Sequence, residues 1–224
     1  MTAANLLQLV DVRDACCEFL QSQLHPTNCL GIKAFADLHG CIDLVAGAES
    51  YIESHFTEVL DCDEFLSLNH RQVIELIASD TITVPSEERV YEAVLAWVNH
   101  KPETRKKNLP ELMENVRLPL LSKDYLIERV KAEPLMEEFS QCKDYIIEAL
   151  TYHLTLGDKE RINPASLAML NSIRTKIRQP VGRPKVMLAI GGQAPKAIRS
   201  VEYYDFKVRQ LSSLFGAIFT NLSC

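Results

Sequence analysis

Residues 86–121 read SEERVYEAVLAWVNHKPETRKKNLPELMENVRLPLL, and this stretch decides the fold of the chain. Apolar residues recur in its first half at helical spacing, at Val90, Val94, Trp97 and Val98. Tyr91 and Leu95 widen the apolar stripe onto the neighbouring face. A helix that is apolar over so much of its circumference needs other helices on several sides. The pattern therefore predicts the central helix of a helical bundle.

The ends of this helix are marked by polar and proline residues. Ser86 is the expected N-cap, and Glu87 and Glu88 place negative charge on the first turn, where the helix dipole favours it. Trp97 is the only tryptophan of the chain and is expected to anchor the core rather than to stack on a ligand. The predicted structural core comprises Val90, Val94, Trp97, Val98, Leu118 and Leu120.

Composition indicates an ordinary globular protein. The chain has 224 residues, of which 47% are hydrophobic and 24% charged. Its net charge of −6 argues against a nucleic-acid-binding surface. No run reaches the roughly 18 apolar residues of a transmembrane helix. The N-terminus also lacks the basic region and cleavage site of a signal peptide. We expect a cytoplasmic protein with no membrane or nucleic-acid partner.

The cysteines predict buried thiols in a reducing compartment. There are seven, an odd number, with no CxxC pair. Cys16, Cys29, Cys41 and Cys142 lie among apolar residues and are expected to act as small core side chains. The alternative is a metal site made of His25, Cys29, His39 and Cys41. Zinc sites usually take such ligands from a CxxC-like knuckle, which is missing here, so we expect no metal and no cofactor.

The rest of the first 156 residues reads as further helices with short connections. The pattern predicts one helix over Asn5–Leu24 and another after the turn at residues 25–28, ending near Gly40. Asp61 and Glu64 have the spacing of a capping box for a short helix, and Asn69 opens the next one. The remaining predicted helices are Ile42–Phe56, Leu109–Val116, one capped by Ser122, and Cys142–Leu156, which carries a partly buried structural His153. Together they predict an antiparallel helical stack.

Two charged segments interrupt this pattern. Residues 101–108, KPETRKKN, read as a solvated loop; Arg105, Lys106 and Lys107 invite a phosphate-binding alternative, but no aromatic or glycine-rich partner accompanies them. Residues 157–185 are basic and rich in proline, and they predict an interdomain linker. Contact of this linker with RNA or phosphoinositide is the lesser alternative. Beyond it, Val186–Ile190, stopped by Gly191-Gly192, and Ser200–Phe206 read as strands.

Several long motifs resemble the kelch-like proteins. SEERVYEAVLAWVNH, VRLPLLSKDYLIERV and CKDYIIEALTYHL resemble the BACK domain of that family. PKVMLAIGGQAPKAIRSVEYYDF is similar to the opening of the first kelch blade in relatives of the ring-canal kelch protein. The resemblance spans roughly Asn5 to Lys207. Family members are substrate adaptors of cullin-3 ubiquitin ligases, built from a BTB domain, a BACK domain and a kelch β-propeller.

The resemblance implies a division of the chain. Residues 1–24 match the last BTB helices, 25–156 the BACK domain, 157–184 the linker and 185–207 a partial first kelch repeat, and residues 208–224 form a divergent tail. A propeller needs at least about four blades to close. The expected fold is therefore mainly α, an antiparallel helical stack followed by a linker and an incomplete blade. Without the body of the BTB domain and its dimer surface, we expect a monomer.

The expected function is a non-catalytic protein-interaction adaptor. The chain has no GxSxG, P-loop, HExxH or dinucleotide motif. Neighbouring acids such as Glu87-Glu88 are expected on helix surfaces, where they do not face a common site. The resemblance implies cullin-3 as one partner, held by helices after the BTB domain, and a protein substrate held by the propeller; the alternative is an actin-binding cytoskeletal protein. The candidate interface residues are Asn28, Leu30, Ile32 and Phe35.

Overall fold

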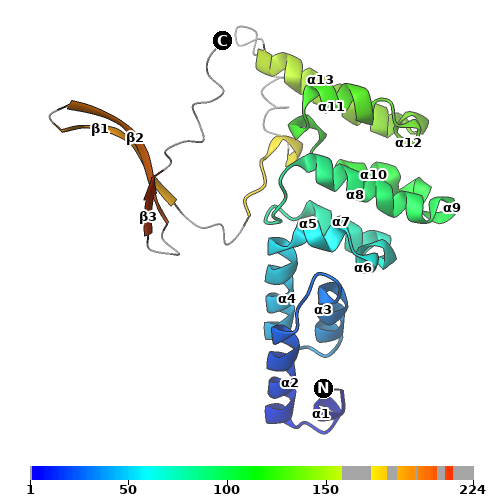
Figure 1. Cartoon of the computed structure of the whole chain (residues 1–224). Coiled ribbons are helices and arrows are strands. Elements are labelled where there is room, and N and C mark those ends of the chain that lie inside the picture. The colour runs from blue at the N-terminus through cyan, green and yellow to red at the C-terminus, as the bar shows by residue number, and fades with distance from the viewer. Residues whose placement is uncertain (1, 158–172, 181–185, 195, 206–209, 214–224) are drawn as a thin grey trace. The chain divides into compact units, whose positions relative to one another are not determined.

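The computed structural model describes residues 2–157, 173–180, 186–194, 196–205 and 210–213 (Figure 1). The chain divides into two units, Met1–Val181 and Gly182–Cys224.

The first unit is a stack of helices, which confirms the predicted fold class. Figure 1 shows the layers that contain α7, α8 and α13 lying one on another, with α2, α3 and α4 at the N-terminal end. The α-helices are α1 Thr2–Leu6, α2 Val10–Ser22, α3 Cys29–Leu38, α4 Ile42–Ser54, α5 Phe56–Leu60, α6 Asp63–Ser67, α7 His70–Ala78, α8 Glu87–His100, α9 Pro102–Arg105, α10 Leu109–Glu114, α11 Lys123–Tyr125, α12 Pro134–Glu138 and α13 Ser140–Gly157. Shorter turns are η1 Lys106–Asn108, η2 Leu118–Leu120, the π-helical η3 Leu126–Val130 and η4 Ile173–Thr175.

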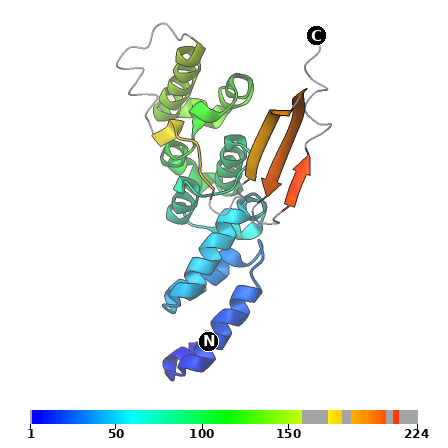
Figure 2. The ribbon, with the colours of Figure 1, turned by 90° about the vertical axis from the view of Figure 1, so that its left-hand side faces the viewer.

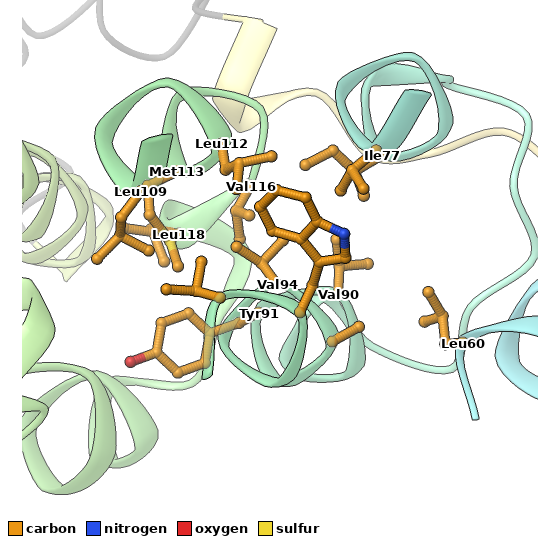
Figure 3. Packing of buried hydrophobic residues seen from close by; sticks show 14 of the residues in the cluster. Leu60, Ile77, Val90, Tyr91, Val94, Leu109, Leu112, Met113, Val116 and Leu118 are labelled. Carbon is orange, nitrogen blue, oxygen red and sulfur yellow. The ribbon is translucent and has the colours of Figure 1, made fainter. Parts of the chain in front are cut away.

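The main core surrounds α8, as the apolar stripe predicted (Figure 3). Five of the predicted core residues are at most 1% exposed: Val90, Val94, Trp97, Val98 and Leu118. Leu120 is only half-buried, and Leu121, 2% exposed, lies in the core instead. The reason is that η2 is a 3₁₀ turn with three residues per turn, which places residues 118 and 121 on one side.

The first predicted helix is interrupted, so the prediction of a single helix over Asn5–Leu24 is wrong. Gln8 has a φ of 56°, in the left-handed region. The backbone N–H of Leu9 donates to the carbonyl oxygen of Ala4 at 2.8 Å, the bond of a Schellman-type helix end. The apolar period continues across this break, and for that reason the sequence pattern does not reveal it.

The capping box predicted at Asp61 and Glu64 does not form. Helix α6 begins at Asp63, and the carboxylate of Glu64 accepts the backbone N–H groups of Leu30 at 3.2 Å and Gly31 at 3.3 Å. A carboxylate at the first turn of α3 is favoured there by the helix dipole. Glu64 therefore ties α3 to α6 instead of capping its own helix. The cap predicted at Asn69 is confirmed, and its side chain accepts from the backbone N–H of Gln72 at 3.1 Å.

The segment predicted as a solvated loop, residues 101–108, is helical, although most of its residues are exposed as predicted, and Arg105 is buried rather than free to bind phosphate. The segment forms α9 and η1, and Arg105 is 7% exposed. Its guanidinium lies 4.0 Å from the centroid of the Trp97 ring and donates to the carbonyl oxygens of Trp97 and Leu66, both at 2.8 Å. The carbonyl of Trp97 lies in the last turn of α8, where no intrahelical donor is left for it. Arg105 is thus a helix-capping core residue.

The segment after α13 packs back onto the helices. We call residues 173–180 the return segment; it begins with η4 and belongs to the first unit. In Figure 1 it is drawn in yellow and runs past the ends of the stacked helices. It falls within the linker predicted over residues 157–184, of which 158–172 and 181–184 lie outside the described residues. The described part is docked on the helices through side chains and through its backbone, where the N–H of Gln179 donates to the carbonyl oxygen of Asp80 at 2.7 Å.

Arg178 holds the return segment to the start of α8. Its side chain is 4% exposed and pairs with the carboxylate of Glu87, which is 5% exposed. Arg178 Nη1 also donates to the carbonyl oxygens of Ile77 at 2.8 Å and Ser79 at 2.6 Å, at the end of α7. The prediction that Glu87 lies on the helix surface is wrong because this distant cation covers it. Ser86 makes no side-chain capping bond.

Two further ion pairs join the return segment to the stack. Arg174 donates to both carboxylate oxygens of Glu148 on α13, at 3.2 and 2.5 Å. Asp80 pairs with Lys176 and with Arg117, which is 2% exposed. The hydrogen bond from Lys176, together with that from Arg117, lowers the pKa of Asp80 despite its partial burial. Ion pairs of Arg174, Lys176 and Arg178 therefore all hold the return segment to the stack.

The second unit contains a three-stranded antiparallel sheet in the order β1-β2-β3 (Figure 2). Its strands are β1 Val186–Ala194, β2 Lys196–Asp205 and β3 Gln210–Ser213. Val186 lies opposite Asp205, and β1 continues through Gly191-Gly192, where the register shifts, instead of stopping there. β3 was not predicted, and it falls in the segment expected to be a divergent tail. Residues 206–209 and 214–224 of that region lie outside the described residues.

Candidate interaction surface on helix α3

The four predicted interface residues lie on or beside α3, but they do not form one surface. Asn28 precedes the helix, and its side-chain amide is committed to the preceding turn. Its Oδ1 accepts the backbone N–H of His25 at 2.8 Å, and its Nδ2 donates to the carbonyl oxygen of Gln23 at 2.9 Å. Asn28 therefore shapes the entry to α3 and offers little to a partner.

The three apolar residues face different neighbours. Leu30 is 8% exposed and belongs to the main core. Ile32 is half-buried and packs on a second, smaller cluster formed by Ala36, Cys41 and Leu44. Phe35 is also half-buried, and its ring meets that of His39 edge-on at 4.5 Å between centroids. Helix α3 thus presents one side to α4 and α7 and another to α2.

A groove of about 520 Å³ opens between α3, α4 and α7. Leu30, Ile52 and Ile82 contribute its buried apolar lining. Acidic residues and one lysine complete the lining: Lys33, Asp37, Glu49, Glu53 and Glu75. Lys33 pairs with Glu49 at 3.0 Å across α3 and α4, which leaves the lining with an excess of negative charge. Sequence reasoning missed these acids because they come from three separate helices.

A second, more apolar hollow of about 460 Å³ lies between α2 and α3. Its lining residues are Val12, Ala15, Cys16, Phe19, Leu20 and Phe35. Phe19 is 63% exposed, and further large apolar side chains are exposed in α1 and in its connection to α2, including Leu6 at 81%. Large exposed apolar patches often mark interaction surfaces. Cys16 is half-buried here and is not the fully buried core thiol that we predicted.

The other predicted thiols are buried. Cys29, Cys41 and Cys142 are at most 7% exposed. Burial raises the pKa values of Cys29 and Cys142 to about 11, so both thiols stay protonated near neutral pH. A protonated thiol is a poor nucleophile and a poor metal ligand. Within the residues that the structure describes, no group of three or more His, Cys, Asp or Glu side chains is arranged to hold a metal ion.

His153 has the structural role that the sequence predicted. It is half-buried, and its Nε2 lies 2.9 Å from the carbonyl oxygen of Leu121. This contact links α13 to the end of η2. None of the helices in the described part of the chain combines the length and the apolar character needed to cross a membrane.

Comparison with known proteins shows extensive similarity. Residues 29–131 match the family model described as "BACK: BTB And C-terminal Kelch". The chain is 55% identical over 207 residues to Kelch-like protein 2 of Homo sapiens. The aligned region covers 92% of this chain and 34% of that protein. It is 56% identical to Kelch-like protein 3 of Bos taurus over the same shares, and 53% identical over 208 residues to Kelch-like protein 3 of Danio rerio. The chain spans about a third of the length of the curated relatives it matches.

Proposed function

This chain belongs to the kelch-like family, and from that premise we propose that it is a non-catalytic interaction module of a substrate adaptor. The proposal includes cullin-3 as a partner, in a cytoplasmic ubiquitin ligase. The observation that carries it is the groove between α3, α4 and α7, which lies largely within the part of the chain that matches the BACK model.

The groove suits one segment of a partner polypeptide. Its apolar lining can take an apolar side chain, and the acidic residues around it favour a basic neighbour. We infer that α3 and α4 hold the N-terminal region of cullin-3 by this groove, with the hollow between α2 and α3 as an adjoining surface. Leu30 and Phe35 would then contribute to separate parts of the interface, one on each side of α3.

A non-catalytic role also fits the state of the buried and partly buried ionisable groups. Glu87 and Glu148 are paired with Arg178 and Arg174 in the docked return segment. The buried thiols of Cys29 and Cys142 are held protonated. These groups stabilise the fold and have no free capacity for proton transfer or nucleophilic attack.

Isothermal titration calorimetry with the N-terminal region of cullin-3 tests this proposal. We expect binding weaker than micromolar, because a groove of this size is only part of a standard interface. Replacing Asp37 and Glu75 together by lysine is expected to weaken binding several-fold, since both are exposed, and the reversal places positive charge beside the groove. Glu137→Lys, on the exposed face of α12, is the control and should bind like the unchanged chain.

No detectable binding by the unchanged chain would contradict this proposal. Submicromolar binding would contradict the expected weak affinity and would mean that this chain carries a complete interface. Equal binding by the unchanged chain and the Asp37→Lys, Glu75→Lys double variant would place the contact away from the groove. Co-sedimentation with filamentous actin distinguishes the proposed adaptor role from the actin-binding alternative. We expect the chain to remain in the supernatant, as a chain that does not bind actin would.

A further inference from the structure

A pocket of about 390 Å³ lies between α8 and the segment from α11 to α12. Helix α8 contributes Tyr91, Glu92 and Leu95, and the opposite wall contributes Tyr125, Glu128, Arg129, Ala132 and Glu133. None of these residues lines the groove beside α3. An inference about this pocket therefore stands independently of the proposed function.

The hydroxyl group of Tyr91 is the unusual feature of this pocket. Tyr91 is 2% exposed, and its buried hydroxyl oxygen has no hydrogen-bond partner among the residues that the structure describes. Figure 3 shows this oxygen at the far end of the ring, pointing away from Ile77 and the labelled side chains near it. A buried hydroxyl left without a hydrogen bond costs about 1–3 kcal/mol. A phenylalanine at this position would avoid that cost. The hydroxyl is therefore explained if a group of another molecule forms a hydrogen bond with it.

The surrounding charges indicate the kind of partner. The pocket walls carry three carboxylates and one guanidinium, those of Glu92, Glu128, Glu133 and Arg129. Glu92 is paired with Arg89 at 3.2 Å, which leaves Glu128 and Glu133 against Arg129. Tyr125 donates its hydroxyl hydrogen to Glu92 at 3.1 Å, and the Tyr91 and Tyr125 rings meet edge to face with their centroids 6.1 Å apart. Two aromatic rings within an excess of negative charge are the complement of an organic cation.

Two arginines of this chain already bind in surroundings of the same kind, an aromatic ring next to hydrogen-bond acceptors. Arg174 lies 4.8 Å from the centroid of the Tyr145 ring while it donates to both carboxylate oxygens of Glu148. Arg105 lies over Trp97 while it donates to two carbonyl oxygens. A guanidinium can do this because it is planar and carries five N–H donors, whereas an ammonium is a compact charge with three.

We propose that this pocket binds an arginine side chain of a partner polypeptide. The hydroxyl oxygen of Tyr91 accepts one guanidinium N–H, the guanidinium lies against the half-buried ring of Tyr125, and Glu128 and Glu133 balance its charge. The groove beside α3 and this pocket then give the helical stack two separate points of attachment.

NMR titration of the ¹⁵N-labelled chain tests the ligand chemistry. The probe is N-acetyl-arginine amide, and the matched neutral probe is N-acetyl-citrulline amide. The arginine probe is expected to shift the backbone amide signals of α8 and of residues 125–133, and the citrulline probe to leave them unchanged. N-acetyl-lysine amide and spermidine are expected to bind at least several-fold more weakly. Tighter binding of spermidine would overturn the proposal in favour of a free polyamine.

Two variants test the roles of individual groups. Tyr91→Phe removes only the unpartnered hydroxyl, so the fold should be at least as stable in thermal melts, while affinity for the arginine probe falls about tenfold. Glu128→Gln, at an exposed position, should also weaken binding, and Glu137→Gln, outside the pocket, should not. Three results would each overturn the proposal and leave solvent as the occupant of the pocket. They are equal binding of the arginine and citrulline probes, unchanged affinity in both pocket variants, and no shift of the amide signals with any probe.

Discussion

Arg178→Ala is expected to lower the free energy of unfolding of the helical unit by about 3–5 kcal/mol. The substitution removes the countercharge of Glu87, whose side chain is only 5% exposed. It also removes the donor shared by the carbonyl oxygens of Ile77 and Ser79. A buried carboxylate left without a partner costs far more than the lost contacts between the two side chains.

Urea unfolding followed by the fluorescence of Trp97 measures this loss. Arg71→Ala, which removes an exposed arginine of α7, is the matched control and should change stability by less than about 0.5 kcal/mol. The double variant Glu87→Gln, Arg178→Met should recover much of the loss, because removing both charges leaves neither one buried alone. A loss below about 1 kcal/mol for Arg178→Ala would mean that the return segment is not docked in solution.

Trp97→Ala is expected to cost about 3–5 kcal/mol, the usual range for removing a large aromatic side chain from a core. Trp97 is 1% exposed, and its Nε1 donates to the carbonyl oxygen of Leu68 at 3.0 Å. Its ring also supports the guanidinium of Arg105. The substitution therefore opens a cavity, leaves a carbonyl without its donor and removes the surface on which Arg105 stacks.

Circular dichroism in urea measures the effect of this substitution, because the variant lacks the fluorescent side chain. Trp97→Phe is the matched control and should cost clearly less, since most of the apolar volume is retained. A loss below about 1 kcal/mol for Trp97→Ala would contradict the packing described around α8.

The helical architecture could be predicted because it depends on local periodicity. The spacing of Val90, Val94 and Trp97 is visible in the sequence alone, and it places α8 in the centre of the stack. The interruption at Gln8 and the exchange of Leu120 for Leu121 could not be predicted in this way. Both depend on backbone conformations, a left-handed residue and a 3₁₀ turn, that leave the apolar pattern unchanged.

The charged residues show where sequence reasoning fails. Glu87 and Arg105 look like surface residues, because charged side chains usually are. Each is buried because its partners come from elsewhere in the chain: Arg178 for Glu87, and the carbonyl of Leu66 with the ring of Trp97 for Arg105. The basic composition of residues 157–185 likewise suggested a linker, although three of its cations make specific pairs with the stack.

The candidate site was predicted only in part, for a similar reason. The family resemblance directed attention to α3, where the structure has a groove on one side and an apolar hollow on the other. The acids beside the groove come from α3, α4 and α7, and no local pattern joins them. Tyr91 was predicted to lie on the apolar face of α8, but whether its hydroxyl has a partner depends on residues from another part of the stack.

Hydrogen exchange of the full chain, measured with and without an excess of the N-terminal region of cullin-3, tests the central claim most directly. If α3 and α4 carry the interaction, amide exchange slows in these helices and in the adjoining part of α7, while exchange in α13 and the return segment is unchanged. Unchanged exchange in α3 and α4 at saturating cullin-3, or slowed exchange confined to other helices, would contradict the claim that this chain is an interaction module acting through that surface.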